Sequence, residues 1–166
     1  MVTRLGYPVL LVTNQGWVAT GRITFREADE ATGGLARHLR RAGVAVLDYA
    51  FCPHHPRVTT GPYGGPCACR KPEPGLLLRL ARRHAIDLGR SLMVGDSLVD
   101  VEAGRRAGTH AALVLTGEGS RHRAHVPDDV WVLTSVADLP ARLGENGAGS
   151  FGKRKAGLRK SPASPT

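Results

Sequence analysis

The sequence predicts an α/β fold with a mainly parallel sheet, and three observations support that prediction. Short apolar runs alternate with amphipathic segments along residues 7–143. The apolar runs are continuous rather than alternating, which is typical of strands buried on both faces of a parallel sheet. Two of these runs are followed directly by polar residues, at Asn14 and at Asp96. Ligands of α/β proteins bind at this end of the strands.

The first half of the chain contains two expected strands, one helix and one long loop. Residues 7–13 form the first expected strand. Thr24 and Glu27 have the spacing of a capping box, and the helix they begin is expected to end near Gly43. Residues 44–51 form a second strand. Residues 52–74 are rich in Pro and Gly, and an irregular loop of that length is usually functional or held by another group.

The second half continues the alternation. Residues 75–84 predict a helix with a leucine-rich face, and residues 91–95 predict a short strand. Ser97 is expected to cap a helix over 98–107 that ends at Gly108. Residues 110–115 and 130–133 predict two further strands, and Ser135 is expected to cap a last helix that runs to residue 143.

The composition indicates one domain and a basic tail. The chain has 166 residues, with 23 Lys and Arg against 14 Asp and Glu, which gives a formal net charge of +9. Residues 144–166 contain five basic residues and one acid and have few apolar residues, so we expect a disordered basic tail there. Residues 1–143 are expected to form the single folded domain.

Composition also argues against several classes of protein. No run of eighteen apolar residues occurs, and the first residues lack the pattern of a secretory or transit peptide, so neither a membrane protein nor a secreted precursor is expected. Three cysteines are an odd number for a disulfide framework. Metal binding in a reducing cytoplasm is therefore the interpretation of the cysteines.

The cysteines and one histidine have the spacing of a metal site. Cys52, His54, Cys67 and Cys69 form the pattern C-x-H-x12-C-x-C, which uses every cysteine of the chain. Three thiolates and one imidazole are a closed tetrahedral set that suits structural zinc. The residues between them cannot form a core of their own, so a metal would order the loop. His55 could take the place of His54, but His54 gives both halves the same one-residue gap.

A second group of residues suits a phosphate ester. Thr13 ends the first strand, where its hydroxyl could donate a hydrogen bond to a phosphoryl oxygen. Arg70 and Lys71 follow the proposed zinc ligands, so an ordered loop would direct two cations at the edge of the sheet. Asp96 and Asp100 lie at the end of a strand and in the first turn of the next helix, where carboxylates serve either metal binding or the helix dipole.

Taken together, these motifs resemble those of the haloacid dehalogenase superfamily. The matching segments are Thr13-Asn14-Gln15, the cysteine and histidine loop, Cys69-Arg70-Lys71-Pro72 and Val94-Gly95-Asp96. Within the superfamily the zinc-loop phosphatases of heptose bisphosphate and of histidinol phosphate are the most similar group. The resemblance implies a Rossmann-like sheet with flanking helices, a phosphatase activity, a catalytic Mg²⁺ and a structural Zn²⁺.

The resemblance also implies roles for individual residues. In the family, the counterparts of Thr13 and Lys71 bind the phosphoryl group during its transfer. The counterpart of Asp96 is a ligand of Mg²⁺, and that of Arg70 helps to recognise the substrate. Asn14 and Gln15 are expected to contribute to substrate binding.

One departure from the family is large. The reaction uses an Asp-x-Asp pair whose first carboxylate attacks phosphorus and whose second transfers the proton. No Asp-x-Asp occurs in these 166 residues, so we expect residues 1–166 alone to be inactive. The strand that carries the pair would lie between the strand ending at Thr13 and the one ending at Gly95. An internal start, a split gene and a non-catalytic remnant each account for the departure, and we favour the internal start.

A smaller departure from the family sequence concerns the choice of substrate. The family loop Asn-Gln-Ser-Gly-Ile-Ala-Arg-Gly is here NQGWVATG, which removes two polar side chains and adds Trp17. A sugar phosphate, such as the heptose bisphosphate, is the expected substrate, with histidinol phosphate as the alternative. A non-catalytic protein that binds nucleic acid through the basic tail is the other hypothesis. The shortage of aromatic residues and of any nucleic-acid module argues against it.

Overall fold

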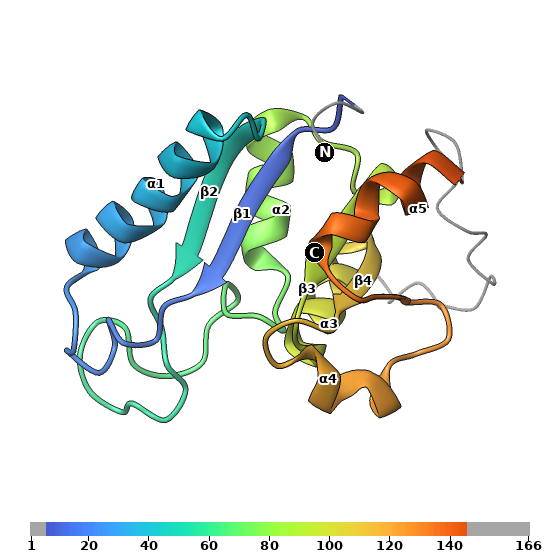
Figure 1. Ribbon diagram of the computed structural model, residues 1–166. Coiled ribbons are helices and arrows are strands. Elements are labelled where there is room, and N and C mark those ends of the chain that lie inside the picture. Colours follow the sequence, from blue (N-terminus) through green and yellow to red (C-terminus); the bar gives the residue numbers. More distant parts are fainter. Residues whose placement is uncertain (1–5, 146–166) are drawn as a thin grey trace, which may run out of the picture.

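The computed structural model describes residues 6–145 and contains two parallel sheets flanked by helices (Figure 1). The smaller sheet consists of β1 (Val9–Asn14) and β2 (Val46–Cys52), and the larger one has the order β3-β4-β5. The larger sheet is formed by β3 (Leu92–Gly95), β4 (His110–Val114) and β5 (Trp131–Leu133). The predicted α/β class and the parallel pairing are confirmed.

Helices cover both sheets. The longer helices are α1 (Phe25–Arg41), α2 (Gly75–His84) and α3 (Leu98–Ala107), and α5 (Leu139–Glu145) is the last. A short helix α4 (Gly119–His122) and the 3-10 turns Leu88–Arg90 and Arg123–His125 were not predicted, because segments of three or four residues carry no periodic pattern. The predicted helix after Ser135 begins as a 3-10 turn over Val136–Asp138 and continues as α5. The expected disordered tail lies, from residue 146 onward, outside the described residues. No helix among residues 6–145 is long and apolar enough to cross a membrane.

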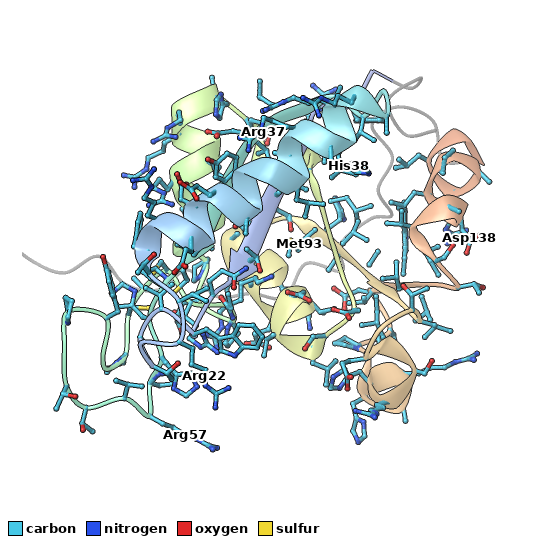
Figure 2. All side chains as sticks on the ribbon, turned by 60° about the vertical axis from the view of Figure 1, so that its left-hand side comes forward. Arg22, Arg37, His38, Arg57, Met93 and Asp138 are labelled. Carbon is cyan, nitrogen blue, oxygen red and sulfur yellow. The ribbon has the colours of Figure 1, made fainter. Side chains whose placement is uncertain are left out.

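Charged and apolar side chains separate as the sequence pattern predicts. Met93 is 7% exposed and lies within the molecule, whereas Arg37 and His38 project from the outer face of α1 (Figure 2). The side chains of Leu76, Leu80 and Leu113 are almost completely buried. These side chains lie between the sheets and helices α2 and α3, and two further buried clusters join α1 to β2 and α5 to β4 and β5.

The helix boundaries follow the capping residues that the sequence indicated. The Thr24 hydroxyl accepts a hydrogen bond from the Glu27 amide at 3.1 Å, and the Glu27 carboxylate accepts one from the Thr24 amide at 2.7 Å. The first of these bonds satisfies an amide that the helix itself leaves without a partner. Ser97 caps α3 through the Val99 amide. Ser135 likewise accepts the Ala137 amide at the start of the last helical segment. All three predicted caps are confirmed.

Replacing Thr24 by Ala is expected to lower the free energy of unfolding by about 1 kcal/mol, because the amide at the third helical position loses its acceptor. Urea unfolding at pH 7 measures this difference. Thr60→Ala, in an exposed loop, is the matched control and should change stability little. Equal effects of the two substitutions would contradict the assigned cap.

The beginning of β2 is held by a charged cluster on α2. The Asp48 carboxylate lies 2.8 Å from His84 Nε2 and 3.1 Å from Arg83 Nη1, and it accepts the Tyr49 amide at 2.8 Å. Burial alone would raise the pKa of Asp48. The hydrogen bonds from His84 and Tyr49 outweigh burial, so the pKa of Asp48 lies below its ordinary value.

This lowered pKa sets a direction for the pH dependence of stability. A carboxyl whose pKa is depressed by folding stabilises the protein above its unfolded pKa, and this stabilisation is lost as the pH falls through the folded value. Asp48→Asn should therefore be less stable than the wild type at pH 7, and the difference should shrink below about pH 4. Urea unfolding of the two proteins at pH 7 and at pH 3 measures the difference at each pH. A difference that persists at pH 3 would contradict the ionic role, and the exposed Asp129→Asn is the control.

The exposure of β1 differs from what its sequence predicts. Its apolar residues were expected to be buried on both faces, yet all six residues of β1 are only partly buried. The physical reason is that β1 pairs with β2 on one side and with no other strand among residues 6–145. The position at which the resemblance places a further strand, between β1 and β3, is occupied by no described strand.

Candidate active site and metal centre

The carboxyl end of β1 is joined to the loop that follows β2 by a pair of reciprocal hydrogen bonds. The Lys71 amide donates to Asn14 Oδ1, and Asn14 Nδ2 donates to the Lys71 carbonyl, each at 3.0 Å. The Gln15 amide donates to the Cys52 carbonyl at 2.7 Å. Asn14 and Gln15, which were expected to contact substrate, thus also position this loop. Residues that are 57 positions apart in the sequence meet at one end of the sheet.

The Lys71 side chain lies between the two sheets. Its Nζ donates to the Val12 carbonyl at 3.1 Å and forms an ion pair of 2.6 Å with Asp100 Oδ1. The side chains of Lys71 and Asp100 are only 10% and 8% exposed. Asp100 was noted in the sequence as a helix-start acid but was not assigned to the site. The partner of a lysine 29 positions away cannot be read from local sequence.

Asp96 lies at the end of β3, on the same side of the molecule. Its Oδ2 accepts a hydrogen bond from the Glu118 amide at 3.1 Å. Gly117 precedes that amide with φ of +61°, and a Cβ at this position would lie 2.1 Å from Asp96 Oδ2. Only glycine fits here. The loop after β4 therefore orients the Asp96 carboxylate, and the glycine is the only local feature that points to this contact.

Thr13 and Arg70 are positioned by separate contacts near this end of β1. Thr13 is a half-buried residue of β1 that is paired with Phe51 of β2. Arg70 Nη1 donates to the His54 carbonyl at 2.9 Å. A Cβ on Gly16 would lie 3.1 Å from this guanidinium nitrogen and 2.9 Å from His55 Cδ2. The glycine thus leaves room for Arg70 and His55 against the loop that follows β1.

The four predicted zinc ligands meet at one point. The sulfur atom of Cys52 lies 3.6 Å from that of Cys67 and 3.2 Å from that of Cys69, and Cys67 and Cys69 are separated by 3.5 Å. His54 Nδ1 lies 3.4 Å from the sulfur of Cys69. Zinc–sulfur bonds of about 2.3 Å in a tetrahedron put the sulfur atoms about 3.8 Å apart. The donor set and its spacing fit zinc.

The choice between the two histidines follows from the geometry. His54 directs Nδ1 at the sulfur atoms of Cys52 and Cys69, whereas His55 Nδ1 accepts the Arg57 amide at 3.2 Å. The cluster of candidate ligand atoms contains His54 and not His55, with all atoms within 4.8 Å of one another. The preference for His54 agrees with this arrangement.

The thiols of this cluster influence each other strongly. Burial, followed by the hydrogen bond with Cys69, raises the pKa of the Cys52 thiol far above its ordinary value. Burial would also raise the pKa of Cys67, but hydrogen bonds from Cys69 outweigh it and lower that pKa. Several thiolates cannot share so small a volume without a cation between them. The cluster therefore has the chemistry of a metal site.

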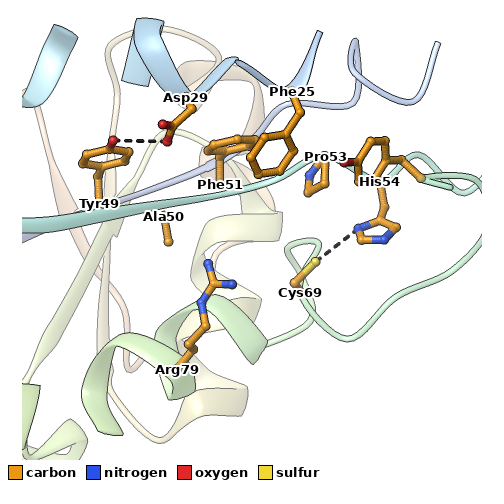
Figure 3. A pocket seen from close by; sticks show the side chains of 10 residues that line it. Phe25, Asp29, Tyr49, Ala50, Phe51, Pro53, His54, Cys69 and Arg79 are labelled. Carbon is orange, nitrogen blue, oxygen red and sulfur yellow. Dashed lines mark hydrogen bonds between the residues drawn. The ribbon is translucent and has the colours of Figure 1, made fainter. Parts of the chain in front are cut away.

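A pocket of about 350 Å³ adjoins the metal cluster (Figure 3). Its wall is mainly aromatic: the ring centroids of Phe25 and Phe51 are 4.9 Å apart, and the Tyr63 ring stacks on Phe25 and meets His54 edge-on. Neither Lys71 nor Asp96 lines this pocket. We interpret these rings as the packing that supports His54, because they join the metal loop to the start of α1.

Comparisons with known proteins agree with this arrangement. A family profile described as HAD-hydrolase-like matches residues 68–139. The D-glycero-β-D-manno-heptose-1,7-bisphosphate 7-phosphatase of Yersinia pestis is 38% identical over 141 residues, which are 84% of this chain and 74% of that protein. The chain belongs to the haloacid dehalogenase-like phosphatases. The protein of the same name in Escherichia coli K12 is 36% identical over 84% of this chain and 73% of its own length.

A solved structure extends this relationship to the fold. The D,D-heptose 1,7-bisphosphate phosphatase of B. bronchiseptica, complexed with magnesium and phosphate, superposes with a TM-score of 0.75. It is 32% identical and covers 88% of this chain and 79% of that one. The predicted superfamily, its Rossmann-like fold and the hydrolase class of this phosphatase are therefore confirmed. The roles of individual site residues remain predictions.

Proposed function

We propose that this haloacid dehalogenase-like phosphatase binds the phosphate of a phosphorylated sugar, D-glycero-D-manno-heptose 1,7-bisphosphate, between the carboxyl ends of β1 and β3. The observation that carries the proposal is that Lys71, tied to Asn14 at the end of β1, lies 2.6 Å from Asp100, in the first turn of the helix that follows Asp96. The names of the relatives support the choice of sugar phosphate.

Each side chain has a task in this proposal. The Thr13 hydroxyl donates to a phosphoryl oxygen, and the Lys71 ammonium neutralises the negative charge that spreads over the phosphoryl oxygens. Arg70 lies on the metal-ordered loop, from which its guanidinium binds polar groups of the substrate. Asn14 and Gln15 keep that loop against the end of β1. Cys52, His54, Cys67 and Cys69 hold a zinc ion that keeps the loop ordered.

Magnesium would be held by Asp96. Mg²⁺ in phosphoryl-transfer sites takes one or two carboxylates together with substrate oxygens and water, and Asp96 offers a carboxylate already oriented by the Glu118 amide. When bound, the ion neutralises phosphate charge and fixes the orientation of the ester. The nucleophilic carboxylate of the family is absent from residues 1–166, so these residues bind the ester but are expected not to hydrolyse it.

Calorimetric titration with the heptose bisphosphate in the presence of Mg²⁺ tests the proposal. Asp96→Asn should abolish the dependence on Mg²⁺, and Arg70→Met should weaken binding roughly 10- to 100-fold, as expected for a lost charge-assisted hydrogen bond. Arg57→Met removes an exposed arginine of the same loop and should change affinity little. Equal losses in the Arg70 and Arg57 variants would contradict a specific role for Arg70.

Substrate choice is tested with the same titration. Trp17 is 60% exposed and follows Gly16, which lies against Arg70 and His55. Arg22 and Arg57 project from the two neighbouring loops (Figure 2). An exposed indole near cations suits a polar ring with phosphate groups. Tighter binding of histidinol phosphate than of the heptose bisphosphate would identify the alternative substrate.

Three further assignments belong to this proposal. Phosphate binding resides in residues 1–143, which form the phosphatase domain, and the basic residues of 144–166 take no part in it. Cysteines that form no disulfide and serve as metal ligands suit the reducing cytoplasm. Binding of the chain to nucleic acid at moderate salt, lost with residues 144–166, would instead favour the binding-protein hypothesis.

A further inference from the structure

The aromatic pocket beside the metal cluster leads to one of the three sulfur atoms. Cys69 lines this cavity of about 350 Å³, whereas Cys52 and Cys67 do not. The sulfur of Cys69 is directed at His54 (Figure 3). Cys69 is partly buried and Cys52 is completely buried. A small solute that enters the pocket therefore meets the sulfur of Cys69 and not that of Cys52.

The buried sulfur of Cys52 is the nearest partner for that of Cys69. The two atoms lie 3.2 Å apart, whereas Cys69 and Cys67 are separated by 3.5 Å. Because the sulfur atoms of a disulfide lie about 2.05 Å apart, a movement of about 1 Å would join Cys52 to Cys69. Cys67 and Cys69 are separated by a single residue, and so short a loop closes into a ring with difficulty.

The chemistry of a metal cluster favours oxidation of these sulfur atoms. A thiol that coordinates a metal ion is deprotonated, and the thiolate is the form that reacts with peroxides. Oxidation is selective for thiolates that a small oxidant can reach. Of the three cysteines of the chain, Cys69 combines a position among the metal ligands with a position in the pocket wall.

We propose that Cys69 and Cys52 are a redox pair, which hydrogen peroxide entering through the pocket converts into a disulfide. The Cys69 thiolate attacks one peroxide oxygen and the O–O bond breaks, which gives the sulfenic acid of Cys69 and a hydroxide ion. The Cys52 thiolate then attacks the Cys69 sulfur, the S–O bond breaks, and a second hydroxide leaves. Two electrons pass from the sulfur atoms to the peroxide, and the two hydroxides carry away all of its atoms.

Formation of this disulfide would release the metal ion. Structural zinc takes four ligands, and the disulfide leaves only His54 and Cys67. The segment that carries Arg70 then loses its support, since the Arg70 guanidinium donates to the His54 carbonyl at 2.9 Å. Reduction by a thiol with zinc present restores the cluster. The release of zinc rests on the zinc site proposed above, whereas formation of the disulfide does not.

Mass spectrometry of the full chain, loaded with zinc and treated with an excess of hydrogen peroxide, tests the inference. The remaining thiols are alkylated before digestion with trypsin, which separates Cys52 from the other two cysteines because Arg57 lies between them. We expect one disulfide between the Cys52 peptide and residues 58–70, with the alkyl group on Cys67. Elemental analysis should show the zinc content fall from one ion per chain to well below one. Dithiothreitol followed by zinc should restore the original content.

Two substitutions on the same helix test access through the pocket. Phe25 lines the pocket and is 46% exposed, whereas Leu35 is 51% exposed and does not line it. Phe25→Ala should release zinc to peroxide roughly threefold faster or more, because it exposes the Cys69 sulfur, and Leu35→Ala should not change the rate. Release of zinc to EDTA without peroxide corrects for any loosening of the loop. Cys52→Ser should stop the reaction at the sulfenic acid of Cys69, which dimedone traps.

Several outcomes would overturn the inference. One is the absence of a disulfide in the wild type after peroxide, and another is a disulfide that contains Cys67. Equal rates for Phe25→Ala and Leu35→Ala would exclude the route through the pocket. A protein that holds no zinc before treatment would contradict the proposed zinc site, and a disulfide between its Cys52 and Cys69 would still support the redox pair.

Discussion

Removal of zinc is expected to lower the free energy of unfolding by about 4 kcal/mol or more, relative to protein kept in free zinc at a thousandfold excess over its dissociation constant. The reason is that residues 53–74 form no helix or strand and have a small apolar content, so the cluster of three sulfurs and His54 is their principal support. Thermal unfolding with and without 1,10-phenanthroline measures the change.

Two substitutions, one of a candidate zinc ligand and one of a neighbouring histidine, test the assignment of the metal site. Cys69→Ser should reduce the zinc content, measured by elemental analysis, from one ion per chain to well below one. His55→Ala keeps all four candidate ligands and should retain the full zinc content and stability. Equal zinc content in both variants, or a melting temperature that does not change when 1,10-phenanthroline is added, would contradict the assigned site.

Loss of Lys71 is expected to destabilise the fold by roughly 3–5 kcal/mol, because it leaves the carboxylate of Asp100 buried without its cation. Lys71→Met and Asp100→Leu should each be costly. The double variant, which replaces the whole pair by apolar side chains, should lose much less than the two single losses together. Urea unfolding of the wild type, the two single variants and the double variant at pH 7 measures this double-mutant cycle. The comparison requires that the free energy of unfolding falls with urea at the same slope in all four proteins.

An exposed ion pair of the same protein serves as the reference for that cycle. Arg26 and Glu30 lie 2.8 Å apart on α1 with exposed side chains of 87% and 60%. Arg26→Met should cost no more than about 1 kcal/mol, since solvent screens such pairs. If the losses from Lys71→Met and Asp100→Leu were additive, the two residues would not act as a buried pair.

The sequence predicts those parts of the fold and site whose signal is local. The capping box at Thr24, the Ser97 cap and the residues 75–84 of α2 are each specified by a few neighbouring residues, and all three are observed. The metal cluster was also predictable, because four ligands of fixed chemistry lie in two pairs with one-residue gaps.

The rest depends on contacts between distant segments. The ion pair of Lys71 with Asp100, and the Glu118 amide on Asp96, join separate elements and leave no local pattern. The exposure of β1 was predicted incorrectly for a related reason. A run of apolar residues indicates a strand suited to burial, but burial requires neighbours on both sides, and those neighbours are not encoded in the run itself.

The reciprocal hydrogen bonds between Asn14 and Lys71 attach the loop that follows β2 to the carboxyl end of β1, so that the two segments move together. A metal bound by the cluster would hold the loop at Cys69, two residues before Lys71, and a phosphate bound at Lys71 would restrain the same segment. Thermodynamic reciprocity then requires that whatever factor zinc adds to phosphate affinity, phosphate adds to zinc affinity. A shortage of zinc would therefore lower the occupancy of the phosphate site even when the substrate is plentiful.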